Sequence, residues 1–243
     1  MRPIPPYANR QSRRNPFDGM SIPLIACFDV SNASRFTPAG SKIDTLKDFS
    51  GNGRDFTQVT DARRWTYHAI GTAFACPTMK AAGSQIMQRA GMSAYAAGIT
   101  IAVRFSYAAQ GTVAFETGSG SDSCGLYLDA TPRVRALRQK IGAFTEYASG
   151  GAGLKSIIAT IDPTVAAASQ VRTYDNNVAG SSVSASATAG TVASGTWSIG
   201  ARDVGSGAPG FGATMELAAI AFYAGIATAN DRALINAALN RYV

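Results

Sequence analysis

ITIAVRFSY, residues 99–107, is the stretch that decides the fold. Its side chains alternate in character: one face carries Ile99, Ile101, Val103, Phe105 and Tyr107, and the other carries Thr100, Ala102, Arg104 and Ser106. Successive side chains of a β-strand point to opposite faces, so this period of two predicts a strand with one face buried in a core. Arg104 is expected on the outward face.

Similar short runs follow one another from Ile22 onward, separated by Gly, Asn, Asp, Ser and Pro. They are LIACFDV (24–30), GLYLDA (125–130), RVRALRQ (133–139), SIIATI (156–161), QVRTYD (170–175), TWSIGA (196–201) and MELAAIAFY (215–223). So many short strands need two packed sheets to cover their apolar faces, which predicts an all-β antiparallel sandwich. Hairpins are expected at Gly-Asn-Gly (51–53) and Asp-Asn-Asn (175–177), because Asn and Gly accept the positive φ of tight turns.

One helix is expected, from Asn230 to Tyr242. Apolar residues recur there every three or four positions, at Leu234, Ile235, Ala238, Leu239 and Tyr242. Thr228, followed three residues later by Asp231, resembles a capping box at the start of the helix. We expect this short C-terminal helix to close one edge or end of the sandwich.

The composition favours one globular domain with an extended arm. The chain has 243 residues, of which 46% are hydrophobic and 15% charged, and a β-sandwich of this size commonly forms a single domain. Residues 1–23 differ, because they hold five of the ten prolines and few residues able to form a core. The expected boundary is therefore an arm over 1–23 and a domain over 24–243.

The arm is also basic, with arginines at Arg2, Arg10, Arg13 and Arg14. One interpretation of the arm is an anchor that becomes ordered when it binds a partner. The alternative is a flexible tail. The whole chain carries a net charge of +7, with 17 arginines and 5 lysines, which favours an acidic or anionic neighbour. Arginine is also enriched at ordinary protein interfaces, so we do not expect nucleic acid to be the partner.

Two further basic runs are RRW (63–65) and RVRALRQK (133–140). Alternation places Arg133 and Arg135 on one face of the second run. A solvated sheet face explains this pair best, while a subunit contact or an acidic glycan remains as an alternative.

Three cysteines, Cys27, Cys76 and Cys124, form an odd set without a CxxC pair, which predicts reduced core thiols. The N-terminal residues contain no apolar stretch followed by a small-residue cleavage site, so no secretory signal is expected. Runs of about 18 apolar residues are absent, so no membrane contact is expected. We therefore expect the chain to fold in a reducing cytoplasm.

CFDVSN (27–32) followed by KIDTLKDFSGNGRDFTQ (42–58) resembles the opening of laminin G-like domains of bacteria and phages, which have a concanavalin A-like fold. In that family the second segment reads roughly W-x-D-x-SGNG-x-D-x-x-Q. The matching positions are Asp48, Ser50, Gly51, Asn52, Gly53, Asp55 and Gln58, and Leu46 stands in place of the aromatic residue. This resemblance implies a two-sheet jelly-roll sandwich.

The C-terminal half is similar to the same family. The similar segments are QVRTYDNNVAG (170–180), WSIGAR (197–202), a glycine-rich loop (205–212), MELAAIAFY and the terminal helix. Asn177 replaces the glycine that is usual in the hairpin. The resemblance covers residues 22–243 and indicates the fold much more strongly than a function.

The sequence lacks the residue patterns of a hydrolase. A glycosidase needs a pair of carboxylates, whereas Glu116, Glu146 and Glu216 are isolated from one another. His68 is the single histidine and has no serine or cysteine partner motif, so a catalytic triad is not expected. We expect no enzymatic activity and no cofactor.

Calcium is the one metal that the resemblance raises, because some laminin G-like relatives hold it with loop aspartates and carbonyls. The acids in loop-like sequence are Asp48, Asp55, Asp122 and Asp203. Hydrogen bonds that cap turns explain these residues better than a metal site does.

Two functions remain open. The first is a non-enzymatic phage virion structural protein, either a capsid decoration (cement) protein or a tail-associated component, anchored by its arm to other virion proteins in a symmetric assembly. Such a protein would be located in the virion after assembly in the host cytoplasm. The alternative is a lectin-like module that recognises host surface glycans by stacking on Trp65, Tyr67 and Tyr95, with Trp197 expected in the core.

Overall fold

The computed structural model describes residues 15–107, 112–117, 122–128, 133–140, 143–150, 153–203, 209–210 and 212–242. Within these ranges the chain is mostly β-strand, with one α-helix and three short 3-10 helices, which are η1 (Ala33–Arg35), η2 (Asp61–Arg63) and η3 (Ala167–Ser169). The all-β prediction is confirmed. That α-helix is neither long nor apolar enough to cross a membrane.

The first layer contains the strand that was predicted at residues 99–107. Its antiparallel order is β1 (Leu24–Asp29), β20 (Thr214–Ala224), β8 (Ile99–Tyr107), β13 (Gly153–Ile161) and β14 (Val171–Asp175). β6 (Thr78–Ala82) pairs with the first part of β20 and continues the layer through β5 (Trp65–His68), β3 (Lys42–Leu46) and β2 (Phe36–Ala39).

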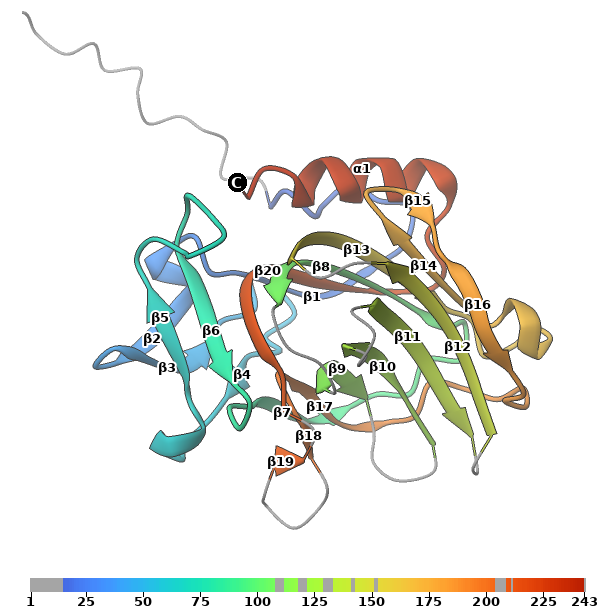
Figure 1. Cartoon of the computed structure of the whole chain (residues 1–243), viewed down its shortest axis with the longest axis horizontal. Coiled ribbons are helices and arrows are strands. Elements are labelled where there is room, and N and C mark those ends of the chain that lie inside the picture. The colour runs from blue at the N-terminus through green and yellow to red at the C-terminus, as the bar shows by residue number, and fades with distance from the viewer. Residues whose placement is uncertain are drawn as a thin grey trace, which may run out of the picture.

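The second layer packs against the first (Figure 1). Its order is β7 (Met87–Met92), β17 (Gly195–Ile199), β9 (Thr112–Thr117), β10 (Asp122–Leu128), β11 (Arg133–Lys140), β12 (Ala143–Gly150) and β16 (Ser181–Ala185). β4 (Phe56–Thr57) pairs with β3 of one layer and with β7 of the other, so it links the two. The short strand β15 (Val178–Ala179) extends β14, while β18 (Arg202–Asp203) and β19 (Pro209–Gly210) pair with each other as a separate two-stranded sheet. The two packed layers are the jelly-roll sandwich that the sequence predicted.

The main core lies between the layers. The five residues predicted to share the inner face of β8 are all buried in it. An aromatic cluster joins the layers, with Phe28 and Phe56 rings 5.0 Å apart and Trp197 and Phe222 rings 5.3 Å apart. The period of two in residues 99–107 therefore identified the buried face correctly.

The helix α1 (Ala229–Leu239) begins with the predicted capping box, in which Thr228 and Asp231 bond each other's backbone N–H. Its position differs from the expectation, because it lies over the outer face of β8 and β13 instead of closing an edge or end (Figure 1). The reason is a second apolar cluster on that face, where Ala102 and Ile158 pack with Leu239 and other helix residues. Covering this face removes its apolar side chains from water, which is favourable.

Arg104 points away from the main core, as predicted, but it is buried beneath the end of α1 instead of facing solvent. Its Nε donates to the carbonyl of Tyr242 at 3.0 Å, and its guanidinium donates to Ser156 Oγ at 2.8 Å. Burial lowers the pKa of Arg104 from its usual value. The outer face of β8 is therefore a second interior.

The hairpin predicted at 175–177 is confirmed. β14 and β15 pair across it, and Asn176 and Asn177 have φ values of 48° and 66°. The 51–53 turn lies in the longer loop between β3 and β4, where Gly51 and Gly53 have φ values of 90° and 65°.

The described part of the expected arm, residues 15–23, packs on the sandwich. Phe17 is fully buried and stacks on Tyr242, with ring centroids 6.4 Å apart. Ser21 donates from its backbone N and its Oγ to the carboxylate of Asp231, at 2.7 and 2.6 Å. The packed segment thus begins before residue 24, because Phe17, Met20 and Ile22 pack on the second cluster. The arm arginines Arg2, Arg10, Arg13 and Arg14 lie outside the described residues.

Candidate functional site

A pocket of about 170 Å³ lies on the outer face of the first layer, where β6, β20 and β8 run side by side. One wall is the loop before β6, which contributes Thr72 and Ala73. The floor comes from the strands, and its polar members are Lys80, Ser106, Thr214 and Glu216.

The register of the strands sets the order of these side chains. Lys80 on β6 pairs with Glu216 on β20, Glu216 pairs with Ser106 on β8, and Ser106 pairs with Leu154 on β13. Side chains directly opposite on neighbouring strands are about 5 Å apart. An ammonium, a carboxylate, a hydroxyl and a half-exposed leucine therefore follow one another across four strands.

Glu216 fastens the loop wall to the floor. The residue is 5% exposed, and its Oε1 accepts hydrogen bonds from Thr72 N at 2.7 Å and Thr78 Oγ1 at 2.5 Å, while Oε2 accepts from Ala73 N at 3.2 Å. Gly71 permits this approach, because a Cβ at that position would lie 2.5 Å from Glu216 Oε1. The buried carboxylate thus holds the wall in a fixed position.

Other polar groups of the pocket are not engaged by side chains that the structure describes. Within the described part of the chain, the hydroxyls of Thr72, Ser106 and Thr214 and the ammonium of Lys80 make no side-chain hydrogen bond or ion pair. Hydroxyls can both donate and accept, and an ammonium donates up to three hydrogen bonds. The pocket therefore offers donors and acceptors that a polar ligand could complete.

The aromatic residues predicted to stack on a glycan do not line this pocket. Trp65 is fully buried in the main core, so its ring faces are covered and the stacking role predicted for it is not available. Tyr67 is half-buried with its ring 4.8 Å from that of Phe36, and Tyr95 is half-buried with its ring 5.7 Å from that of Trp197. Both tyrosines pack onto the core. Trp197 itself is buried, as expected.

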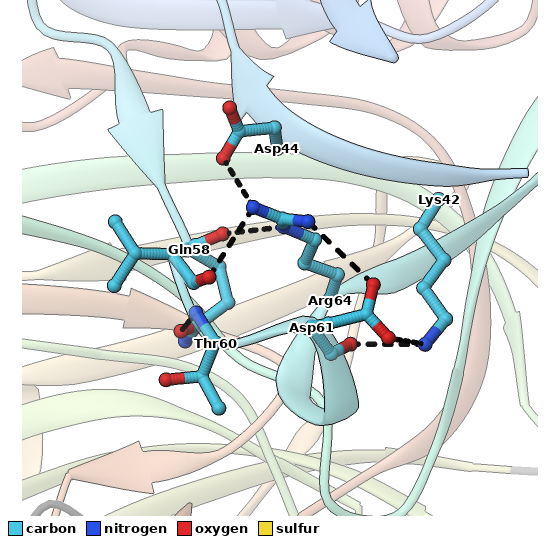
Figure 2. Close-up of polar contacts among 7 residues, drawn as sticks. Lys42, Asp44, Gln58, Thr60, Asp61 and Arg64 are labelled. Atoms are coloured by element: carbon cyan, nitrogen blue, oxygen red, sulfur yellow. Dashed lines mark hydrogen bonds and ion pairs between the residues drawn. The ribbon is translucent and has the colours of Figure 1, made fainter. Parts of the chain in front are cut away.

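Of the basic run at 63–65, Trp65 is in the main core and Arg63 is half-buried, while Arg64 belongs to the polar cluster that Figure 2 shows. Arg64 donates to the carbonyl of Gln58 at 2.8 Å and to Asp44 at 3.2 Å, and it lies 3.5 Å from Asp61. Lys42 also bonds Asp61, at 2.6 Å. These mutual contacts hold the segment that connects β4 to β5, so the cluster has a structural role.

Arg133 and Arg135 share a face, as predicted, because Val134 and Ala136 between and beside them are buried in the main core. Arg135 is the register partner of Tyr127 on β10, and both arginines are half-buried. This face belongs to the second layer and contributes nothing to the pocket.

Two of the four aspartates considered for calcium, Asp48 and Asp55, bond backbone groups of the loop between β3 and β4. Asp48 accepts four hydrogen bonds, from the backbone N of Cys27, Ser50 and Arg54 and from Ser50 Oγ, at 2.8–3.0 Å. Asp55 accepts from Asp48 N at 2.8 Å. With its oxygens saturated by protein donors, Asp48 does not fit the role of a calcium ligand.

Over the described ranges no three acidic, histidine or cysteine side chains gather as a metal site. The side chains of Asp122 and Asp203 lie outside what the structure describes. Cys27, Cys76 and Cys124 form no disulfide bond with one another, as predicted, and Cys27 and Cys124 are buried while Cys76 is half-buried. Burial raises the pKa of the Cys27 thiol well above its usual value, which makes that group unreactive.

The pocket residues were missed by sequence reasoning, although one signal was present. Glu216 is the single charged residue in the apolar strand MELAAIAFY, and a buried acid in such a strand needs donors from another segment. Lys80 and Ser106 gave no comparable signal, because they come from strands that only the fold brings together.

The protein resembles solved β-sandwich domains. No family model and no curated protein sequence matches the chain. Domain 4 of AbnA, a GH43 extracellular arabinanase from Geobacillus stearothermophilus solved in complex with arabinotriose, superposes with a TM-score of 0.56 at 13% identity, covering 88% of this chain and 98% of that one. The binding domain of Paraclostridial Mosquitocidal Protein 1 gives 0.59 at 11% identity, covering 91% and 52%.

A Trypanosoma rangeli sialidase in complex with sialic acid gives a TM-score of 0.54 at 13% identity, covering 88% of this chain and 33% of the sialidase. The chain thus spans about a third of the sialidase and about half of the mosquitocidal binding domain. At these identities the similarity shows the fold alone, which is a β-sandwich.

Proposed function

We propose that this chain is a carbohydrate-binding module whose pocket on β6, β20 and β8 receives a sugar. The observation that carries the proposal is the group of hydroxyls and one ammonium on the pocket surface that no side chain of the described ranges engages. Sugar rings present alternating donors and acceptors, and a site with a few fixed polar groups can orient them.

The fold is compatible with this role. Domain 4 of the arabinanase was solved in complex with arabinotriose and has the same sandwich architecture over nearly its whole length. Because the identity is only 13%, that similarity supports the scaffold and does not transfer a sugar position to this chain.

The proposed role is binding without hydrolysis. Glycoside cleavage uses two carboxylates on either side of the bond, and the described lining of the pocket includes one, Glu216. Its oxygens accept three hydrogen bonds from the loop wall and from Thr78, which gives it a structural task. We propose no cofactor for the same function.

The test is a panel of methyl glycosides measured by saturation-transfer NMR, followed by titration of any ligand found. Ser106→Leu would fill the floor of the pocket and should reduce the affinity at least about ten-fold. Ser182→Leu, at an exposed position on β16, is the matched control and should leave binding unchanged. A panel without any binding at millimolar concentration would refute the proposal.

We also propose, as a second function, that the chain is a structural protein of a phage virion, attached to other virion proteins through its N-terminal arm. The observation in its favour is the fixed root of that arm, where Phe17 is buried and Ser21 is held by Asp231. A segment that leaves a rigid surface at a defined point suits an anchor that is repeated in a symmetric assembly. Virion localisation, after assembly in the host cytoplasm, belongs to this proposal.

The virion proposal is tested by removing residues 1–14 and measuring attachment to purified particles. Attachment should be lost while the domain stays folded. A second variant tests whether positive charge is needed for attachment, and it combines Arg2→Gln, Arg10→Gln, Arg13→Gln and Arg14→Gln. If the deletion variant attaches as well as the wild type, the arm is not the anchor.

A further inference from the structure

Lys80 is a cation at the pocket whose ammonium has no hydrogen-bond or ion-pair partner among the described residues. Its direct register partner across the strands is Glu216, yet the two described side chains form no ion pair. Opposite charges at such a position commonly attract each other. Here Lys80 remains able to donate to a ligand.

The reason lies in how Glu216 is oriented. Both of its oxygens accept from the loop segment 72–78, through two backbone N–H groups and the Thr78 hydroxyl. The loop therefore takes most of the acceptor capacity of the carboxylate, and none of the described residues supplies an acceptor for the Lys80 ammonium.

The size of the pocket limits what can enter. A volume of about 170 Å³ is close to the roughly 150 Å³ cavity that holds one benzene ring in another protein. One sugar ring fits that space, and a second ring would have to lie outside it. The half-exposed Leu154, next in register after Ser106, provides an apolar rim that such a second ring could contact.

We infer that the pocket selects a single sugar ring that carries a carboxylate, such as a hexuronic acid at the end of a glycan. The carboxylate accepts from the Lys80 ammonium, and the ring hydroxyls bond Thr72, Ser106 and Thr214. A charge-assisted hydrogen bond in a partly buried site is stronger than a neutral one. The net charge of +7 further favours the approach of acidic glycans. This inference rests on the proposed sugar-binding function.

The experiment compares sugar pairs that differ only in the carboxylate. The full chain is titrated with the methyl glycosides of glucose and glucuronic acid, galactose and galacturonic acid, and mannose and mannuronic acid. For the stereochemistry that fits, the uronic acid should bind about ten-fold more tightly than the neutral sugar. Raising the salt concentration should weaken the binding of the uronic acid more than the binding of the neutral sugar.

Lys80→Gln should bring the ratio of the two affinities to about one, with folding checked by thermal unfolding. Lys47→Gln removes an exposed lysine that does not line the pocket and should preserve the ratio. If the uronic acid and the neutral sugar bind equally, or if Lys80→Gln leaves the ratio of their affinities unchanged, selection for the carboxylate is refuted. The proposed sugar-binding function would still hold in that case. Failure of all six glycosides to bind would overturn both the inference and the proposed function.

Discussion

At the scale of single residues, Gly200 shows how tightly the main core is packed. Its φ is +95°, and a Cβ there would lie 2.3 Å from Cζ2 of the fully buried Trp65 and 2.8 Å from the carbonyl oxygen of Gln85. Gly200→Ala should therefore lower the free energy of unfolding by about 3–5 kcal/mol in urea titrations, since it combines backbone strain with overpacking.

Gly83 is the matched control for that substitution. Its φ is +103°, and a Cβ at this position would meet no atom within 4 Å. Gly83→Ala should cost only the strain, about 1–2 kcal/mol. If Gly200→Ala and Gly83→Ala lower the free energy of unfolding equally, Trp65 must move to make room for the added methyl group.

Asp231 joins the N-terminal segment to the helix. Burial acts to raise the pKa of Asp231, but hydrogen bonds from Ser21 and Thr228 outweigh it and hold the pKa at about 2. This value is below that of the unfolded chain, so the stabilisation is complete above about pH 4 and is lost as the pH falls through about 2. Asp231→Asn should reduce the free energy of unfolding by about 1–2 kcal/mol at pH 7.

The measurement for Asp231 is urea unfolding of wild type and variant between pH 7 and pH 2. The difference between them should shrink toward pH 2, where the wild-type carboxyl is protonated. Asp18→Asn, at an exposed position in the same segment, should follow the wild type. A difference that stays constant over the whole range would contradict the assignment.

At the scale of elements, Arg104 connects β8 to the end of the chain by donating to the carbonyl of Tyr242 and to Ser156. Arg104→Met would keep the length of the side chain but remove the Arg104 donor from the carbonyl of Tyr242, and Ser156 would keep only its hydrogen bond to Asn240 beneath the helix. We expect faster hydrogen exchange in α1 and a loss of about 1–3 kcal/mol in stability. Arg89→Met, at an exposed position on β7, should change neither.

The sequence predicted elements well where the signal was local. The period of two in β8, the Asn-Asn turn after β14 and the Thr228–Asp231 capping box each depend on neighbouring residues, and each is confirmed. The predicted position of α1 was wrong, because the apolar patch beneath the helix combines Ala102 with Ile158 from a strand about fifty residues away. A face assembled from distant strands leaves no local pattern.

The same reasoning explains why the site was only partly predictable. Aromatic residues were proposed as sugar platforms by residue type, yet Trp65 serves the main core. The pocket depends on the register that places Lys80 beside Glu216 and Glu216 beside Ser106. That register arises because β20, near the end of the chain, lies between β6 and β8.

At the scale of the whole molecule, the N-terminal residues divide into two functional parts. Removing 1–14 should leave the free energy of unfolding within about 0.5 kcal/mol of the wild type, because the sequence of that segment offers little to a core. Phe17→Ala should cost about 3 kcal/mol, because its ring is fully buried against Tyr242. Thermal and urea unfolding of both variants separate the two parts, and a large loss from the deletion would contradict the division.

The contact between Phe17 and Tyr242 brings the two ends of the folded body to one spot on its surface. A unit built in this way can be spliced into a loop of a larger polypeptide without stretching the host, since entry and exit points nearly coincide. Such a unit also tolerates new positions for its termini. A circular permutant in which a short linker joins the two ends of the folded body, and whose new termini lie at the Asn176–Asn177 turn, should therefore refold to the same sandwich.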